Sequence, residues 1–224
     1  MTALHEYYQA LELIPWEQRL QIPAPPSTDW QHLKQCVQAC TACSLHQTRT
    51  QTVFGVGNTQ ADLMIIGEAP GFYEDKQGEP FVGRAGQLLT SMIRAIGLER
   101  NQVYIANILK CRPPENRDPL PDEVSKCTPF LNQQIELVQP KLLLAVGRIA
   151  SHYLLNTKSS LESLRNKLHT YGTINIPLIV TFHPAYLLRN PADKKKAWMD
   201  LIWTQRTLRE LTHGSFSSTS NRTL

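Results

Sequence analysis

The five cysteines of this chain of 224 residues are the residues whose type and spacing most clearly suggest chemistry. Cys40 and Cys43 form a C-x2-C pair, which presents two thiolates to one metal from a single turn. Cys111 and Cys127 are far from this pair and widely spaced. Four thiolates suit either tetrahedral Zn²⁺ or a [4Fe–4S] cluster. Because zinc ribbons usually use two tight pairs, the wide spacing of Cys111 and Cys127 slightly favours an iron–sulfur cluster. Unliganded cysteines in the core are the third interpretation.

The fifth cysteine, Cys36, makes the segment CVQACTAC match the C-x3-C-x2-C spacing that resembles radical S-adenosylmethionine enzymes. Those enzymes usually carry an aromatic residue before the last cysteine, where this chain has Ala42. Their motif follows the first strand of a partial barrel, and no strand is expected before it here. That interpretation would also leave Cys111 and Cys127 without a role. We therefore interpret Cys36 as a bystander, or at most a spare ligand.

A second group of chemically unusual segments begins where apolar runs end. Wholly apolar stretches predict strands at 62–66, 102–109, 141–147 and 177–184. Asp29 could cap a helix that runs from Trp30 into the cysteine group. Further helices are predicted at 83–98, 120–138, 148–155 and 192–211, and Pro129 is expected to kink or split the helix at 120–138. This alternation predicts a three-layer α/β/α sandwich around a four-stranded, mostly parallel sheet.

Ligands of such sheets bind beyond the carboxyl ends of the strands. Each of the four predicted strands is followed there by a polar or glycine-rich segment. In chain order these segments are GEAPG, NILKCRPP, GRIAS and HPAY. We therefore expect them to converge on one pocket.

The composition restricts the class of protein. A hydrophobic fraction of 42% and a charged fraction of 19% are typical of a globular chain, and a net charge of +4 is compatible with a polyanionic partner without proving one. No apolar run reaches the roughly 18–20 residues that span a bilayer, so no membrane role is expected. The first residues lack a basic segment followed by an apolar one, so we expect a cytoplasmic protein.

The same features predict three parts. Residues 1–29 form an N-terminal arm with a short helix at 2–13 and a Pro-rich linker, IPAPPSTD. Residues 30–212 form one domain that contains the cysteine site. Residues 213–224 form a flexible polar tail.

Three motifs and the cysteine framework occur together in one order: GEAPGFYED…GEPFVGRAGQLL, IANILKCRPPENRDP and HPAYLLRNP. This combination resembles the family 4 (iron–sulfur, thermophile-type) uracil-DNA glycosylases over roughly residues 36–210. The resemblance implies an enzyme that flips uracil out of DNA and hydrolyses its N-glycosidic bond. Free uracil and an abasic site would be the products. It also implies a monomer with a [4Fe–4S] cluster on Cys40, Cys43, Cys111 and Cys127.

The resemblance assigns two residues to recognition and two to catalysis. Phe81 would stack on the flipped base, and Asn107 would read the O4/N3–H edge that distinguishes uracil from cytosine. A neutral His183 would donate to uracil O2 and stabilise the departing anion. Glu68 would position the attacking water or face the oxocarbenium ion.

Further substrate contacts are expected in the first loop. Many glycosylases of the wider superfamily carry Asp or Asn where this chain has Ala69, so Glu74 and Asp75 are alternatives for activating the water. The backbone of Gly67 and Gly71 would approach the base or sugar closely. Some relatives carry a Tyr at the position of Gly71 to exclude the thymine methyl group, and Glu74 is the candidate for that role here.

The third motif is expected to contact DNA. Leu187 would be the wedge that fills the hole left by the flipped base, and Arg189 would contact phosphate; alternatively Leu187 and Leu188 belong to the core of an ordinary helix. A track of cations could follow the DNA backbone: Arg84, Arg112, Arg117, Arg148 and Lys194 to Lys196.

The segment after the second predicted strand bears on whether the enzyme turns over. A cousin family forms a covalent bond to DNA through a His in an insert at this place. The corresponding segment here, KCRPPENRDP, has no His and no insert, so turnover is expected. A non-catalytic DNA-binding module on the same fold is the alternative function.

Overall fold

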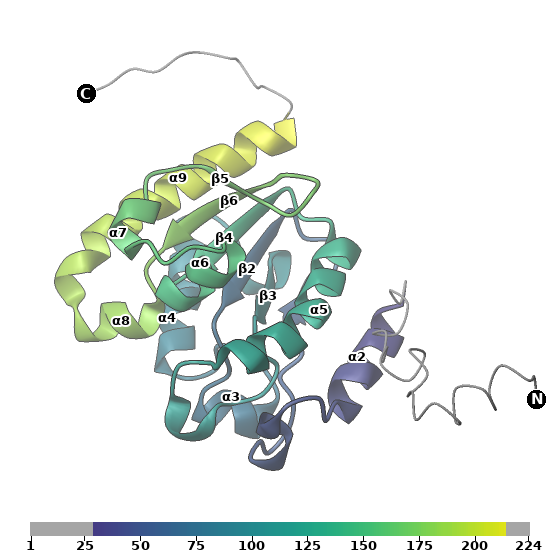
Figure 1. Ribbon diagram of the computed structural model, residues 1–224. Helices are drawn as coiled ribbons and strands as arrows, with labels where there is room; N and C mark the ends of the chain where they lie inside the picture. The colour runs from purple at the N-terminus through teal and green to yellow at the C-terminus, as the bar shows by residue number, and fades with distance from the viewer. Residues whose placement is uncertain (1–28, 214–224) are drawn as a thin grey trace, which may run out of the picture.

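The computed structural model describes residues 29–213, and Figure 1 shows a central sheet with helices on both of its faces. The expected helix at 2–13, the rest of the arm, and the tail beyond 213 lie outside the described residues. Within residues 29–213, no helix is long and apolar enough to cross a membrane.

The described part of the chain contains one six-stranded sheet, in the order β1-β3-β2-β4-β6-β5. The four inner strands pair in parallel and confirm the four predicted strands: β2 (Leu63–Gly67), β3 (Tyr104–Asn107), β4 (Leu142–Val146) and β6 (Ile176–Thr181). The prediction of only four strands was wrong, because short antiparallel strands, β1 (Val56–Gly57) and β5 (His169–Tyr171), add to both edges.

The inner strands are apolar throughout because both faces of the sheet are covered. Met64 and Ile66 point to one face, and Leu63 and Ile65 point to the other. The first face is covered by α5 (Pro121–Val138), α6 (Arg148–Leu154) and α7 (Leu161–Leu164). The second is covered by α4 (Arg84–Ala95), α8 (Pro184–Arg189) and α9 (Lys194–His213). The three-layer prediction is therefore confirmed.

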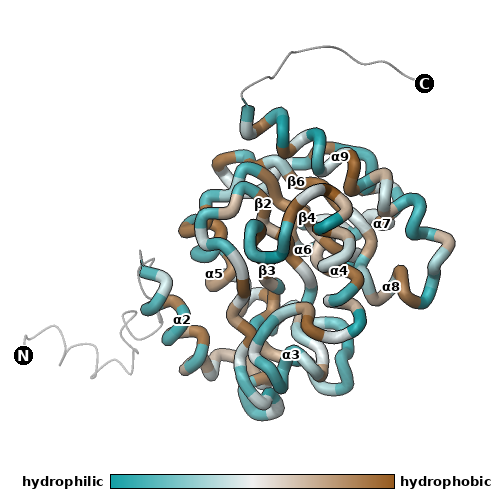
Figure 2. The backbone as a smooth tube through the Cα atoms, turned by 180° about the vertical axis from the view of Figure 1, so that it is seen from behind, coloured by the Kyte–Doolittle hydropathy of each residue, from teal (hydrophilic) through white to brown (hydrophobic). Residues whose placement is uncertain are grey.

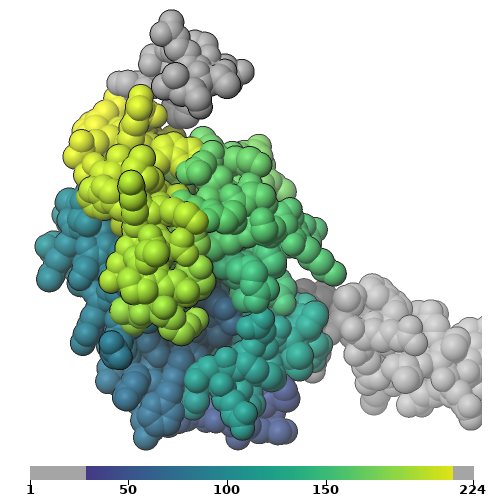
Figure 3. Space-filling view, turned by 90° about the vertical axis from the view of Figure 1, so that its left-hand side faces the viewer, coloured from purple at the N-terminus to yellow at the C-terminus, as the bar shows by residue number. Residues whose placement is uncertain are grey.

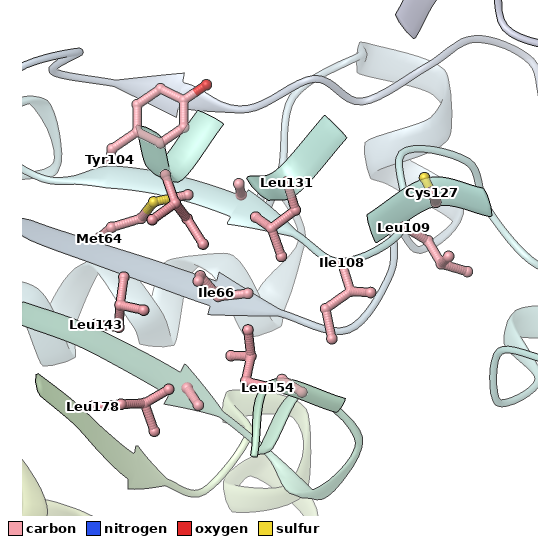
Figure 4. Packing of buried hydrophobic residues seen from close by; sticks show 14 of the residues in the cluster. Met64, Ile66, Tyr104, Ile108, Leu109, Cys127, Leu131, Leu143, Leu154 and Leu178 are labelled. Carbon is pink, nitrogen blue, oxygen red and sulfur yellow. The ribbon is translucent and has the colours of Figure 1, made fainter. Parts of the chain in front are cut away.

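The core packing follows from this alternation. Figure 4 shows Met64, Ile66, Leu143 and Leu178 of the strands facing the layer that carries Leu131 and Leu154. In Figure 2 the strands form a hydrophobic centre, while polar residues are distributed over the outer helices and loops.

Two helices lie around the cysteine segments. α2 (Trp30–Ala39) is capped by Asp29, whose side chain accepts a hydrogen bond from the backbone N–H of Gln31 at 2.9 Å, and it packs against α5. α5 continues through Pro129 as one helix, so the expected split does not occur. Buried residues on both sides of this proline hold the helix on the sheet, which offsets the hydrogen bond that proline cannot make.

Shorter elements complete the connections between these layers. They are α3 (Phe72–Gln77) and the 3-10 helices η2 (Ser44–Gln47), η3 (Arg100–Gln102), η4 (Pro114–Asn116) and η5 (Pro191–Asp193).

The strand order creates a topological switch point. The chain passes from β2 to β3 on one side and then crosses to β4 on the other side of β2. The loops that follow β2 and β4 therefore diverge and leave a crevice at the carboxyl edge of the sheet. Figure 3 shows a hollow on this side, between the yellow-green α8 region and the blue and teal segments.

Candidate active site and cysteine cavity

The cleft at the carboxyl edge is lined by residues from the loops after all four parallel strands. Glu68, Ala69, Pro70 and Gly71 follow β2, Asn107 ends β3, Gly147 and Arg148 follow β4, and His183 follows β6. Phe81 and Glu74 complete the wall on the side of β2. The structure thus brings Glu68, Phe81, Asn107 and His183 together.

Phe81 is held in an unusual backbone conformation. Its φ is 55°, in the left-handed region that few residues other than glycine adopt, and its side chain is buried. A Cβ on Gly86 would come within 1.7 Å of the Phe81 carbonyl oxygen, so α4 approaches this loop closely only because residue 86 is glycine. The strained conformation directs the Phe81 ring into the cleft.

Gly67 makes room for two cleft side chains. A Cβ at this position would lie 2.4 Å from Asn107 Oδ1 and 2.7 Å from Phe81 Cζ. The expectation was that the Gly67 backbone itself approaches the base. In the structure, glycine is required because Phe81 and Asn107 pack across it.

Asn107 carries an unpaired polar atom. The residue is 2% exposed, and its Oδ1 has no hydrogen-bond partner among the described residues. A buried acceptor without a partner costs about 1–3 kcal/mol. A ligand in the cleft that donates a hydrogen bond to Oδ1 would remove this cost.

Lys110 is a residue that sequence reasoning missed. It is 1% exposed, and its Nζ donates to the backbone carbonyl of Asn107 at 2.7 Å and to Gln134 Oε1 at 2.6 Å. Burial lowers the pKa of Lys110 to about 8, and the nearby Cys127 and Cys111 act in the opposite direction. Only its position between Asn107 and Cys111 in the sequence could have drawn attention to it.

His183 is neutral and its tautomer is fixed. It caps α8, and its Nδ1 accepts a hydrogen bond from the backbone N–H of Ala185 at 3.1 Å, so its proton is on Nε2. Burial, and secondarily Arg189, lowers its pKa to about 4. Its ring lies 5.7 Å from that of Phe81. Gly147, with φ at 97°, leaves space for it, because a Cβ there would lie 2.8 Å from His183 Cβ.

Glu68 is a carboxyl group with a strongly shifted pKa. Burial raises this pKa to about 7, with a smaller contribution in the same direction from Asp118 and an opposing one from Arg148. Asp118 and Arg148 pair with each other at 3.0 Å. Glu68 therefore exchanges its proton close to neutral pH, as an acid–base group must.

The two alternative carboxylates differ in position. Glu74 lines the cleft, and its Oε1 accepts from the backbone N–H of Val82 at 3.2 Å, which ties α3 to the Phe81 loop. A Cβ on Gly71 would meet Glu74 Oε2 at 2.7 Å. Asp75 is buried outside the cleft, where it accepts from the backbone N–H of Thr50. The alternative role of Asp75 as water activator is therefore wrong.

The structure also corrects the expected wedge. Leu187 is 1% exposed and packs in the core between α8 and the sheet, because the apolar face of this short helix covers the strands. It cannot insert into DNA in this conformation. Arg189 and Tyr186 of the same helix do line the cleft, and the Tyr186 ring stacks on Phe182 at 5.4 Å. Tyr186 was not predicted.

Several of the expected cations border the cleft, but some already have partners. Arg117 pairs with the buried Glu123 and Arg148 with Asp118. Lys196 lines the cleft and pairs with Glu162 and Asp193.

Four cysteines from separate segments line a second, small cavity. They are Cys40 at the end of α2, Cys43 before η2, Cys111 after β3 and Cys127 in α5; Cys36 is not among the lining residues. Figure 4 shows Cys127 in α5 beside Leu109, at the end of the chain segment that follows β3.

The donors around this cavity suit anionic sulfur. Arg49 donates to Cys111 Sγ at 3.1 Å, and the backbone N–H of Lys110 donates to Cys127 Sγ at 3.2 Å. Burial raises the pKa of both thiols, while Arg49 lowers that of Cys111 and Lys110 lowers that of Cys127. Within residues 29–213, no three His, Cys, Asp or Glu side chains converge closely enough to hold a single metal ion. Four cysteines from separate segments nevertheless line one small cavity, and thiolates are the ligands that both zinc and iron–sulfur sites use.

The fold and the cleft define an α/β protein with a cleft beyond the carboxyl ends of its parallel strands, lined by polar and aromatic side chains. The model of the uracil DNA glycosylase superfamily matches residues 54–205. The chain belongs to this superfamily and, by the relatives described next, to its type-4 uracil-DNA glycosylase family.

Similar proteins from several organisms carry the name type-4 uracil-DNA glycosylase. The one from Sulfurisphaera tokodaii is 45% identical over 73% of this chain and 77% of its own length. The one from Archaeoglobus fulgidus is 44% identical over 69% and 81%, and the one from Thermotoga maritima is 46% identical over 70% and 82%. The resemblance in the motifs is thereby confirmed.

Proposed function

We propose that this protein excises uracil from DNA. It flips the nucleotide out of the stack, hydrolyses the N-glycosidic bond, releases free uracil and leaves an abasic site. The single observation that carries this proposal is the unpaired Asn107 Oδ1 in a cleft shared with Phe81 and the neutral His183, in a chain of this family.

Recognition depends on Asn107 and Phe81. The N3–H of uracil donates to Asn107 Oδ1, whereas N3 of cytosine is an acceptor and would leave that oxygen unpaired. The same amide donates to uracil O4 through its nitrogen. Stacking on Phe81 adds about 1–3 kcal/mol to binding of the base.

Bond cleavage depends on His183 and Glu68. As the C1′–N1 bond breaks, its electron pair goes to uracil, and His183 Nε2–H donates to O2 of the resulting anion. His183 is neutral, so it stabilises the uracil anion by donating a hydrogen bond. It does not need to be protonated first, and it does not need to transfer its proton to uracil. Ionised Glu68 faces the sugar cation and accepts a proton from the water whose oxygen bonds to C1′.

The remaining cleft residues complete the specificity and DNA contacts. Glu74, with Gly71 and Ala69, occupies the side where the thymine methyl group would enter, and so excludes thymine. Arg189 contacts a phosphate, and the cations near the cleft attract the DNA backbone.

We further propose a [4Fe–4S] cluster on Cys40, Cys43, Cys111 and Cys127. These four cysteines would hold the cluster as thiolates, and Arg49 and the backbone N–H of Lys110 would stabilise the sulfurs of Cys111 and Cys127. Its role is structural, because it ties α2 and η2 to α5 and to the segment after β3.

The cysteine assignment predicts that Cys36→Ser keeps the visible absorbance of the purified protein and Cys40→Ser loses it. Cys36 is the matched control because it lies in α2, four residues before Cys40, which caps the end of that helix, and because it is absent from the cavity lining. Absorbance and iron content of both variants provide the measurement. Equal losses would overturn the assignment.

We also propose that residues 30–212 act as one domain, with the arm 1–29 and the tail 213–224 as appendages. The protein would work as a monomer in the cytoplasm. Gel filtration with light scattering, at several concentrations, tests the monomer.

The excision itself is tested with an oligonucleotide that contains one uracil. We expect heating in alkali to break the strand at uracil and not at cytosine or thymine in the same position. Asn107→Ala should abolish most of this cleavage. If the folded protein, with its cysteine site filled, bound this oligonucleotide but did not cleave it, the result would favour the alternative function, a non-catalytic DNA-binding module.

A further inference from the structure

Two large aromatic side chains are exposed at the start of α3. Phe72 is 43% exposed and Tyr73 is 61% exposed, and their rings meet edge to face with centroids 5.3 Å apart. Leaving two such rings in water forfeits hydrophobic free energy. Adjacent exposed aromatics of this kind are typical of a surface that contacts a partner.

This pair is continuous with the cleft. Gly71, which caps α3, lines the cleft immediately before Phe72. Tyr73 lies against the loop that carries Phe81, since a Cβ on Gly83 would be 3.5 Å from its ring. In Figure 1, α3 lies below the carboxyl ends of the strands.

Two cations flank the Phe72 ring. Lys76 Nζ lies 4.7 Å from its centroid and Arg112 Cζ lies 5.1 Å from it. Arg112 Nε also donates to Asn116 Oδ1 at 2.8 Å, and Asn116 lines the cleft. Aromatic rings interleaved with cations are the combination that binds single-stranded nucleic acid, because bases stack on the rings and phosphates approach the cations.

We propose that Phe72 and Tyr73 form a stacking platform that holds an unpaired base next to the extruded uracil, and so raise the rate of excision on single-stranded DNA more than on a duplex. This proposal rests on the proposed uracil excision. In duplex DNA the neighbouring bases are already paired and stacked, so the platform contributes less there. A protein partner would match a broad apolar surface, whereas this one consists of two rings bordered by positive charge.

Alanine variants test the platform through substrate preference. Phe72→Ala and Tyr73→Ala should each lower kcat/KM on a single-stranded uracil oligonucleotide about tenfold, with a clearly smaller loss on the same sequence in a duplex. Phe72→Tyr and Tyr73→Phe, which keep a ring, should restore the activity. Ile174→Ala is the control, because Ile174 is 75% exposed between β5 and β6, away from the cleft.

A binding readout separates this surface from the chemistry. An oligonucleotide with 2-aminopurine beside a 2′-fluorinated deoxyuridine, whose bond resists cleavage, should lose fluorescence when wild-type protein binds it. The double variant of Phe72 and Tyr73 should not quench it. Equal quenching by both proteins, or equal activity losses on the two DNA forms, would overturn the platform. If the wild-type protein failed to release uracil, the proposed excision activity would be wrong. The quenching measurement would still test whether Phe72 and Tyr73 stack on a base.

Discussion

Burial shifts the protonation of the two ionisable residues at the centre of the cleft in opposite directions. The pKa of Glu68 rises to about 7 and that of His183 falls to about 4, because burial disfavours the charged form of each group. At neutral pH, His183 is therefore a neutral donor. Glu68 is close to its midpoint, so its charge depends on small changes in pH.

The state of Glu68 predicts the pH dependence of excision. A folded pKa of about 7, above the ordinary value of 4.5, means that the active carboxylate forms only as pH rises through 7. We therefore expect the single-turnover rate of uracil release to increase between pH 6 and 8, as about one proton is lost. Glu68→Gln should be slow and show no such increase. A variant that retained the wild-type profile would show that another group titrates.

At the scale of elements, a buried ammonium group links the two cavities. Lys110 lines the cysteine cavity and donates to the carbonyl of Asn107 at the end of β3. Its other acceptor, Gln134, lies on α5 and reaches the Tyr104 hydroxyl at 3.2 Å through its amide nitrogen. The strand that carries Asn107 is thus fixed to the helix that carries Cys127.

This linkage predicts that Lys110→Met lowers the free energy of unfolding by about 2 kcal/mol or more, because it leaves two buried acceptors unpaired. Lys141→Met is the matched control. Lys141 is about half exposed and pairs with Asp62 at the surface, so its loss should change that free energy by less than about 1 kcal/mol. Urea unfolding measures both. Similar values for the two variants would contradict a bracing role for Lys110.

The sequence predicted those elements whose residues carry a strong local pattern. The four inner strands are recognisable because burial on both faces makes them wholly apolar. The edge strands β1 and β5 escaped prediction because they are short and partly exposed. Leu187 was misassigned because a helix that packs on the sheet and a loop that inserts into DNA can share an apolar residue.

The site residues also divide into those that sequence motifs predicted and one, Lys110, that they did not. The motifs placed Glu68, Asn107 and His183 at strand ends, and the sheet topology explains why they meet. Lys110 could not be predicted, since its importance depends on Gln134 and on the cysteine cavity, which only the fold brings together.

For the whole molecule, the strand order explains why the cleft and the cysteine cavity are separate sites. β2 lies between β3 and β4, so three loops open around one crevice, and β6 adds the loop that carries His183. The cysteine cavity lies on the other side of the segment after β3, where α2 packs against α5. Residues of this segment therefore line both the cleft and the cysteine cavity.

The central claim is that the cleft binds an extruded uracil and that neutral His183 stabilises the uracil anion that forms when the N-glycosidic bond breaks. The most direct measurement is the single-turnover rate of uracil release by His183→Ala, with His152→Ala as control because His152 lies outside the cleft and bonds to the Ser159 carbonyl. We predict a loss of about 10²–10³-fold for His183→Ala and no change for the control. A His183→Ala protein that released uracil within a few-fold of the wild-type rate would contradict the claim.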